Sequence, residues 1–158
     1  MTIQIGDSAP DAAVFNSADN SPFKLSSLKG KPAVLLFFPA TFSGVCDTEM
    51  CTFRDSMAAY NDVGAQVVAI STDAPPSQRE FVSKHGLKFP VLSDLHHNAI
   101  KAYGLEFENF ARIEGYTVAR RSVVVQDKDG KVTWTWLAEA PGIQPPYDDV
   151  KAAVQALK

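Results

Sequence analysis

The chain has 158 residues, of which 46% are hydrophobic, so it is long enough for one domain with a substantial core, which we expect to span residues 1–158. Its net charge of -3 and the lack of a basic run argue against a nucleic-acid partner. The N-terminus does not resemble a signal peptide, and the longest apolar run, residues 33–38, is too short to span a bilayer. We therefore expect a cytoplasmic protein without a membrane partner.

The first half of the chain alternates between strand and helix patterns. Residues 15–28 are rich in turn formers, with a hairpin tip predicted at residues 19–22. Residues 33–38 are apolar without alternation, which is typical of a strand buried on both faces, and Pro39 ends that strand. The pattern then predicts a long helix over residues 43–61 and a second buried strand over residues 67–71.

The second half continues this alternation and ends with a hairpin and a helix. The predicted elements, in order, are a helix from Pro75 to Lys84, a strand at residues 91–92, a helix over 98–103, a hairpin of strands 122–127 and 132–136, and a helix over 145–157. This order indicates an α/β fold, in which a central mixed sheet carries helices on both faces.

The only two cysteines, Cys46 and Cys51, lie five residues apart where the strand that ends at Pro39 gives way to the predicted helix. A thiol at a helix N-terminus is favoured in its thiolate form, because the positive end of the helix dipole lies next to it. In a reducing compartment, such a pair is more often redox-active or metal-binding than a permanent crosslink. Redox chemistry is therefore the first hypothesis for the chain.

The five-residue spacing has a geometric consequence. Along an ideal helix, two residues five apart differ by a rise of about 7.5 Å, which places their Cα atoms roughly 8 to 9 Å apart. A disulfide requires a Cα separation below about 7 Å. If Cys46 and Cys51 share one helix, they can form a disulfide only after the helix unwinds locally.

Two other interpretations of the cysteines are weaker. Both could be buried as small apolar residues, but the polar neighbours Ser43, Asp47 and Glu49 argue against that. A zinc site needs four ligands, and the three histidines lie far from the cysteines at no recognisable ligand spacing. We expect no bound metal or cofactor.

Pro39, Ser43 and Cys46 form the pattern Pro-x-x-x-Thr/Ser-x-x-Cys, and Arg121 lies directly before the strand predicted at residues 122–127. In these residues the chain resembles a peroxiredoxin, because the pattern matches the family signature in full and Arg121 matches the family's active-site arginine. Further segments match in order along nearly the whole chain, namely residues 6–11, 70–73, 89–94 and 103–104. The chain departs from many relatives at Asp47 and Thr48.

The position of the second cysteine resembles the peroxiredoxin Q, or bacterioferritin-comigratory, group. This resemblance implies a thioredoxin-like fold with an N-terminal β-hairpin extension, and an atypical two-cysteine enzyme in which Cys51 resolves the oxidised Cys46. It also implies a peroxide substrate, thioredoxin or a similar dithiol as the reductant, and a monomer, with a dimer as the alternative. The segments that make some relatives sensitive to overoxidation are absent.

The resemblance also implies a role for each signature residue. Cys46 is the nucleophile, and its pKa is expected to be lowered by Arg121, which supplies a permanent cation. Ser43 is expected to donate to the thiolate or to cap the helix. Glu49 is expected to orient Arg121, and Pro39 to shield the thiolate from water.

Two alternative functions remain open. The first is a one-cysteine peroxidase, in which an external thiol resolves Cys46 and Cys51 is incidental. The second is a thioredoxin-fold redox sensor or relay that passes oxidation to a partner protein.

Overall fold

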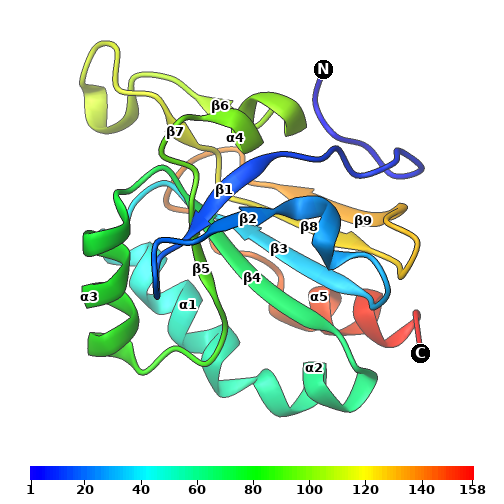
Figure 1. Ribbon diagram of the computed structural model, residues 1–158. Coiled ribbons are helices and arrows are strands. Elements are labelled where there is room, and N and C mark those ends of the chain that lie inside the picture. Colours follow the sequence, from blue (N-terminus) through cyan, green and yellow to red (C-terminus); the bar gives the residue numbers. More distant parts are fainter.

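The computed structural model describes residues 1–158 and is built around one large sheet (Figure 1). Its strands are β1 (Ala13–Asn16), β2 (Pro22–Lys24), β3 (Ala33–Phe37), β4 (Gln66–Ser71), β5 (Val91–Ser93), β6 (Glu106–Phe107), β7 (Val118–Ala119), β8 (Ser122–Gln126) and β9 (Val132–Leu137). Its α-helices are α1 (Val45–Asp55), α2 (Met57–Val63), α3 (Pro75–His85), α4 (Asn98–Tyr103) and α5 (Tyr147–Gln155). Two short 3-10 helices are η1 (Leu25–Leu28) and η2 (Phe110–Arg112).

The large sheet is mixed, as the sequence predicts. Seven strands follow the order β2-β1-β5-β4-β3-β8-β9, in which β3, β4 and β5 run parallel and the other pairs are antiparallel. The N-terminal hairpin of β1 and β2 joins the sheet edge by pairing with β5. The strands β6 and β7 form a small separate sheet.

Helices cover both faces of the sheet, and each face has its own apolar core. All five residues of β3 are buried, which confirms the prediction from its uninterrupted apolar run. Val34 and Leu36 face the core covered by α1, α2, α3 and α5, whereas Leu35 and Phe37 face the core that includes α4 and η1. Figure 1 shows α4 on one side of the sheet, and α1, α2 and α5 on the other. None of the helices combines the length and apolar character needed to cross a bilayer.

The predicted long helix over residues 43–61 is wrong in one respect, because two helices occupy this region. Helix α1 ends at Asp55, and α2 begins at Met57 and continues to Val63. At the break, Ser56 has φ -100° and ψ 4°, and its backbone N–H donates to the carbonyl of Phe53, three residues back. This tight turn lets Phe53 and Tyr60, which are both buried, pack against each other with ring centroids 6.0 Å apart.

Candidate active site

Cys46 lies at the end of the sheet where β3 ends and α1 begins. The buried Pro39 follows β3 closely, and the chain then turns through Gly44, whose φ of 75° suits glycine. The Gly44 carbonyl accepts the first hydrogen bond of α1 from the Thr48 backbone N–H, at 3.0 Å. Cys46, the second residue of α1, is fully buried and is a free thiol.

The register of the sheet brings Arg121 to Cys46. In the antiparallel pair β3 and β8, Phe37 lies opposite Ser122, so Arg121 lies beside the point where the chain leaves β3. Its Nη2 atom donates a hydrogen bond to Cys46 Sγ at 3.0 Å, and its side chain is only 2% exposed. Two residues 75 positions apart in the sequence therefore form a buried contact between a cation and a thiol.

The other two nitrogens of the Arg121 guanidinium also donate hydrogen bonds. Its Nη1 donates to Glu49 Oε1 at 2.6 Å, and its Nε donates to the Pro141 carbonyl at 3.0 Å. Glu49 follows Cys46 by three residues, which places both on the same face of α1. The Glu49 side chain is fully buried, and its second oxygen, Oε2, has no hydrogen-bond partner.

Burial dominates the pKa of the Cys46 thiol and raises it. The Arg121 charge, the Ser43 hydroxyl and the Ala40 backbone act in the opposite direction and lower this pKa, but they do not outweigh burial. The prediction of a lowered pKa is therefore wrong for this reduced, closed arrangement. A sequence reveals the nearby cation, but it does not reveal that the thiol is completely removed from water.

Burial also raises the pKa of Glu49, to about 7, even though the Arg121 charge lowers it. The carboxyl group and the thiol make hydrogen bonds to the same guanidinium. When Glu49 is ionised, part of the charge of Arg121 is neutralised. When Glu49 is protonated, that charge acts fully on Cys46.

The Ser43 side chain does not cap the helix. Gly44 is the N-cap residue of α1, and no side chain makes a capping hydrogen bond there. The Ser43 hydroxyl instead donates to the carbonyl of Ala40 at 2.8 Å, which closes the turn between Pro39 and Cys46. This hydroxyl also contributes to lowering the pKa of Cys46.

Asp73, to which sequence reasoning assigned no role, holds the loop between Pro39 and Cys46 in place. Its carboxylate accepts a hydrogen bond from the Thr41 backbone N–H at 2.9 Å and another from the Ser71 hydroxyl at 2.6 Å. Strands β3 and β4 are parallel neighbours, so the segments that follow them meet at the same edge of the sheet. The position of Asp73 just after β4 was the feature of the sequence that could have placed it near this loop.

Cys51 lies in the second half of α1, is partly exposed and is also a free thiol. Its Sγ lies 3.5 Å from Nδ1 of His85, a second residue to which sequence reasoning gave no role. Both cysteines therefore belong to one intact helix in the reduced protein. No group of three or more histidine, cysteine, aspartate or glutamate side chains is arranged to hold a metal ion.

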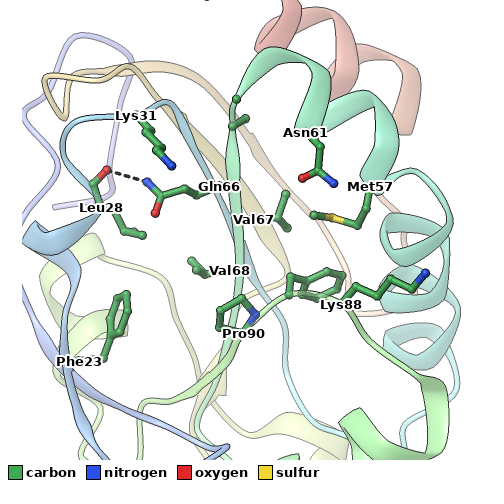
Figure 2. A pocket seen from close by; sticks show the side chains of 13 residues that line it. Phe23, Leu28, Lys31, Met57, Asn61, Gln66, Val67, Val68, Lys88 and Pro90 are labelled. Atoms are coloured by element: carbon green, nitrogen blue, oxygen red, sulfur yellow. Dashed lines mark hydrogen bonds between the residues drawn. The ribbon is translucent and has the colours of Figure 1, made fainter.

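One pocket beside the sheet lies away from Cys46. It has a volume of about 420 Å³ and is found at the opposite edge, where β4 begins (Figure 2). In Figure 2, Gln66 donates to the Leu28 carbonyl at 3.0 Å, and Lys31, Met57 and Lys88 contribute to the lining. None of the residues around Cys46 lines this pocket.

The sequence is similar to those of a known protein family. The sequence profile of the AhpC/TSA family matches residues 5–135. Peroxiredoxin Bcp from Bacillus subtilis is 34% identical over 160 aligned residues, which cover 100% of this chain and 97% of the relative. The chloroplastic peroxiredoxin Q of Populus jackii is 36% identical over 78% of this chain, and the match spans only 56% of that longer protein.

Solved structures agree with this placement. Peroxidoxin BcpB from Mycobacterium tuberculosis matches with a TM-score of 0.86 and 28% identity, over 99% of both chains. A peroxiredoxin-like protein from Aquifex aeolicus matches with a TM-score of 0.89 and 28% identity, over 100% of this chain and 90% of that one. These matches confirm the predicted thioredoxin-like fold. The chain belongs to the AhpC/TSA family, and its relatives there carry the names peroxiredoxin Q and Bcp.

Proposed function

We propose that this protein is a thiol-dependent peroxidase that reduces hydrogen peroxide and organic hydroperoxides through Cys46. The observation that carries this proposal is the buried contact of 3.0 Å between Cys46 Sγ and Arg121 Nη2 at the start of α1, in a chain of the AhpC/TSA family. A nucleophile that is beside a fixed cation and shielded from water suits an attack in which charge develops on the leaving oxygen.

In the first step, the Cys46 thiolate attacks one oxygen of the peroxide. An S–O bond forms, the O–O bond breaks, and the released oxygen is protonated to water or to an alcohol, which leaves Cys46 as a sulfenic acid. Arg121 stabilises the thiolate and the charge on the leaving oxygen. Glu49 and the Pro141 carbonyl support this role by holding the guanidinium in place.

The loop before Cys46 shapes the entrance for the peroxide. Pro39 is buried and has no N–H of its own, so it screens the sulfur without competing for its hydrogen bonds. The exposed Ser43 can turn its hydroxyl from the Ala40 carbonyl towards the incoming peroxide. Ser43 would thus hold the loop closed in the resting protein and contact the peroxide during the reaction.

In the second step, Cys51 condenses with the sulfenic acid to form an intramolecular disulfide and water. Cys46 and Cys51 lie in one helix, where a five-residue separation gives a rise of about 7.5 Å. The first turn of α1 must therefore unwind to bring the two sulfur atoms together. Gly44, at the start of this turn, provides a flexible point where unwinding can begin.

In the third step, an external dithiol reduces the disulfide by thiol exchange, and thioredoxin is the expected reductant. We also propose that residues 1–158 act as one domain and as a monomer. The cytoplasmic location stays a prediction, since the relatives include both a bacterial Bcp and chloroplastic peroxiredoxins.

The activity is tested by following peroxide consumption with thioredoxin, thioredoxin reductase and NADPH. Wild-type protein should turn over, and the Cys46→Ser variant should not, because its hydroxyl is a far weaker nucleophile. Cys51→Ser serves as the matched control, since it retains the first step but loses turnover with thioredoxin. Peroxide consumption by Cys46→Ser at the wild-type rate would contradict the proposal.

A further inference from the structure

Three side chains, one of which is the second cysteine, form a hydrogen-bonded row between α1 and α3. Asp47 and Cys51 are four residues apart in α1 and so lie on the same face of the helix. Both contact the imidazole of His85 from α3: Cys51 Sγ lies 3.5 Å from Nδ1, and Asp47 Oδ2 lies 3.1 Å from Nε2. The imidazole thus bridges a thiol and a carboxylate.

Several contacts fix the position of the imidazole. His85 is the last residue of α3, and its ring packs edge-on against Phe81, with centroids 4.9 Å apart. The Arg54 guanidinium donates to the His85 backbone carbonyl, which ties the second half of α1 to the end of α3. The His85 side chain is only 16% exposed, so its ring is held in one orientation away from bulk water.

The carboxylate determines which nitrogen carries the proton. An ionised Asp47 can only accept, so its contact assigns a hydrogen to Nε2 of the neutral imidazole and leaves the Nδ1 lone pair facing the Cys51 thiol. The Asp47 side chain makes no other hydrogen bond, and its buried Oδ1 atom has no partner. A nucleophile, a base and a group that orients the base are thereby placed in the order that activates a thiol.

We propose that His85 is the general base that activates Cys51 for disulfide formation, and that Asp47 is the residue that positions it. The inference rests on the proposed function, because it concerns the second step of that reaction. It gives a role to Asp47, at which this sequence departs from many relatives, and to His85, which matched no recognisable ligand pattern.

The step is balanced within the chain. While α1 is still helical, the Cys51 thiol gives its proton to Nδ1 of His85. The Cys51 thiolate then attacks the sulfur of the Cys46 sulfenic acid, so that an S–S bond forms and the S–O bond breaks. The Cys51 sulfur is oxidised and the Cys46 sulfur is reduced, and the departing hydroxide takes the proton from His85 to become water.

Other charges near this row are few. Arg54 of α1 lies close to Cys51, and Lys84 of α3 lies 5.5 Å from the centre of the Phe42 ring, which neighbours His85. Neither cation can accept the proton of the thiol. The effect of His85 can therefore be distinguished from that of the cations by experiment, since only the loss of His85 should make the rate of disulfide formation strongly dependent on pH.

The test is a single-turnover experiment on the whole protein, in which the two steps are followed separately. Reduced protein is mixed with hydrogen peroxide and quenched with acid after increasing times, and the sulfenic acid and the disulfide are counted by non-reducing mass spectrometry. His85→Asn places an amide nitrogen near the position of Nδ1 but cannot take a proton. Asp47→Asn tests the positioning residue, and exposed His96→Asn is the matched control.

We expect His85→Asn to form sulfenic acid at the wild-type rate and to close the disulfide about 100-fold more slowly at pH 7, which is a typical loss for a general base. The defect should shrink towards pH 9, because an ordinary thiol ionises near pH 8.5 without help. Asp47→Asn should show a smaller loss in the same step, and His96→Asn none. The normal first step in His85→Asn also demonstrates that this variant is folded.

Three outcomes would overturn the inference. They are an unchanged rate of disulfide formation in His85→Asn, equal slowing of both steps, or a defect that is the same at pH 7 and pH 9. A wild-type protein that forms no intramolecular disulfide would instead contradict the resolving role of Cys51 in the proposed function, and would remove the inference with it. The wild-type measurement thus separates the two failures.

Discussion

Replacing Glu49 by glutamine should remove a pH dependence of stability that the active site imposes on the whole protein. Burial raises the pKa of this carboxyl group from 4.5 to about 7 in the folded state. The folded protein therefore holds the Glu49 proton more tightly than the unfolded chain does. The stability that this proton provides is fully present below about pH 4.5 and is lost as the pH rises through about 7.

The size of the effect follows from that difference. One pKa unit corresponds to about 1.4 kcal/mol, so this single group should lower the free energy of unfolding by about 2 to 3 kcal/mol between pH 5 and pH 8. Glutamine retains the shape of the side chain and a hydrogen-bond acceptor for Arg121, but it does not titrate. The Glu49→Gln variant should therefore lack this loss.

The assay is urea unfolding of the reduced proteins at pH 5, 6, 7 and 8, at constant ionic strength. For each protein, the change in the free energy of unfolding from pH 5 to pH 8 is measured. The change in wild type is then compared with the change in Glu49→Gln, because the contributions of the other titratable groups cancel in this difference. Glu108→Gln, at an exposed position, is the matched control and should follow wild type. The same loss of stability in Glu49→Gln and in wild type would refute the reasoning.

Further predictions concern the groups around the thiol. Arg121→Met removes the guanidinium that donates to Cys46 Sγ, so oxidation of Cys46 by peroxide should slow about 100-fold in stopped-flow measurements, and a rate within tenfold of wild type would contradict its proposed role. Arg121→Met also leaves Glu49 buried without its cation, so its free energy of unfolding in urea at pH 8 should be lower than that of the double variant Arg121→Met/Glu49→Gln. Equal free energies of unfolding would contradict the ion pair between Arg121 and Glu49. Asp73→Ala removes the anchor of the Thr41 backbone N–H, which should cost about 1 to 3 kcal/mol in unfolding free energy and slow Cys46 oxidation several-fold, whereas wild-type values of both would show that the anchor is unimportant.

The sequence was most informative where one local pattern determines the outcome. An uninterrupted apolar run correctly predicted the buried strand β3, because both faces of that strand pack against apolar cores. The signature around Cys46 correctly predicted a thiol at the start of a helix. The pairing of Arg121 with Cys46 came from the resemblance to the family, since composition and periodicity do not contain the β3–β8 register that brings them together.

The features that sequence reasoning missed depend on contacts between distant segments. His85 reaches Cys51 only because α3 packs beside α1, and the sequence separation of 34 residues carries no ligand pattern. Asp73 acts through the parallel pairing of β3 and β4. At the break between α1 and α2, the Ser56 N–H donates to the Phe53 carbonyl, three residues back. The sequence gives no signal for this break, because no proline lies near Ser56.

The central claim is that Cys46 and Cys51 are successive partners in one peroxidase cycle, and intact-mass analysis after one equivalent of hydrogen peroxide tests it most directly. Wild-type protein should lose two hydrogen atoms, about 2 Da, because an intramolecular disulfide forms with release of water. Cys51→Ser should instead gain one oxygen atom, about 16 Da, as the Cys46 sulfenic acid accumulates. Wild-type protein that gains oxygen without forming the disulfide, or that stays unchanged, would contradict the account.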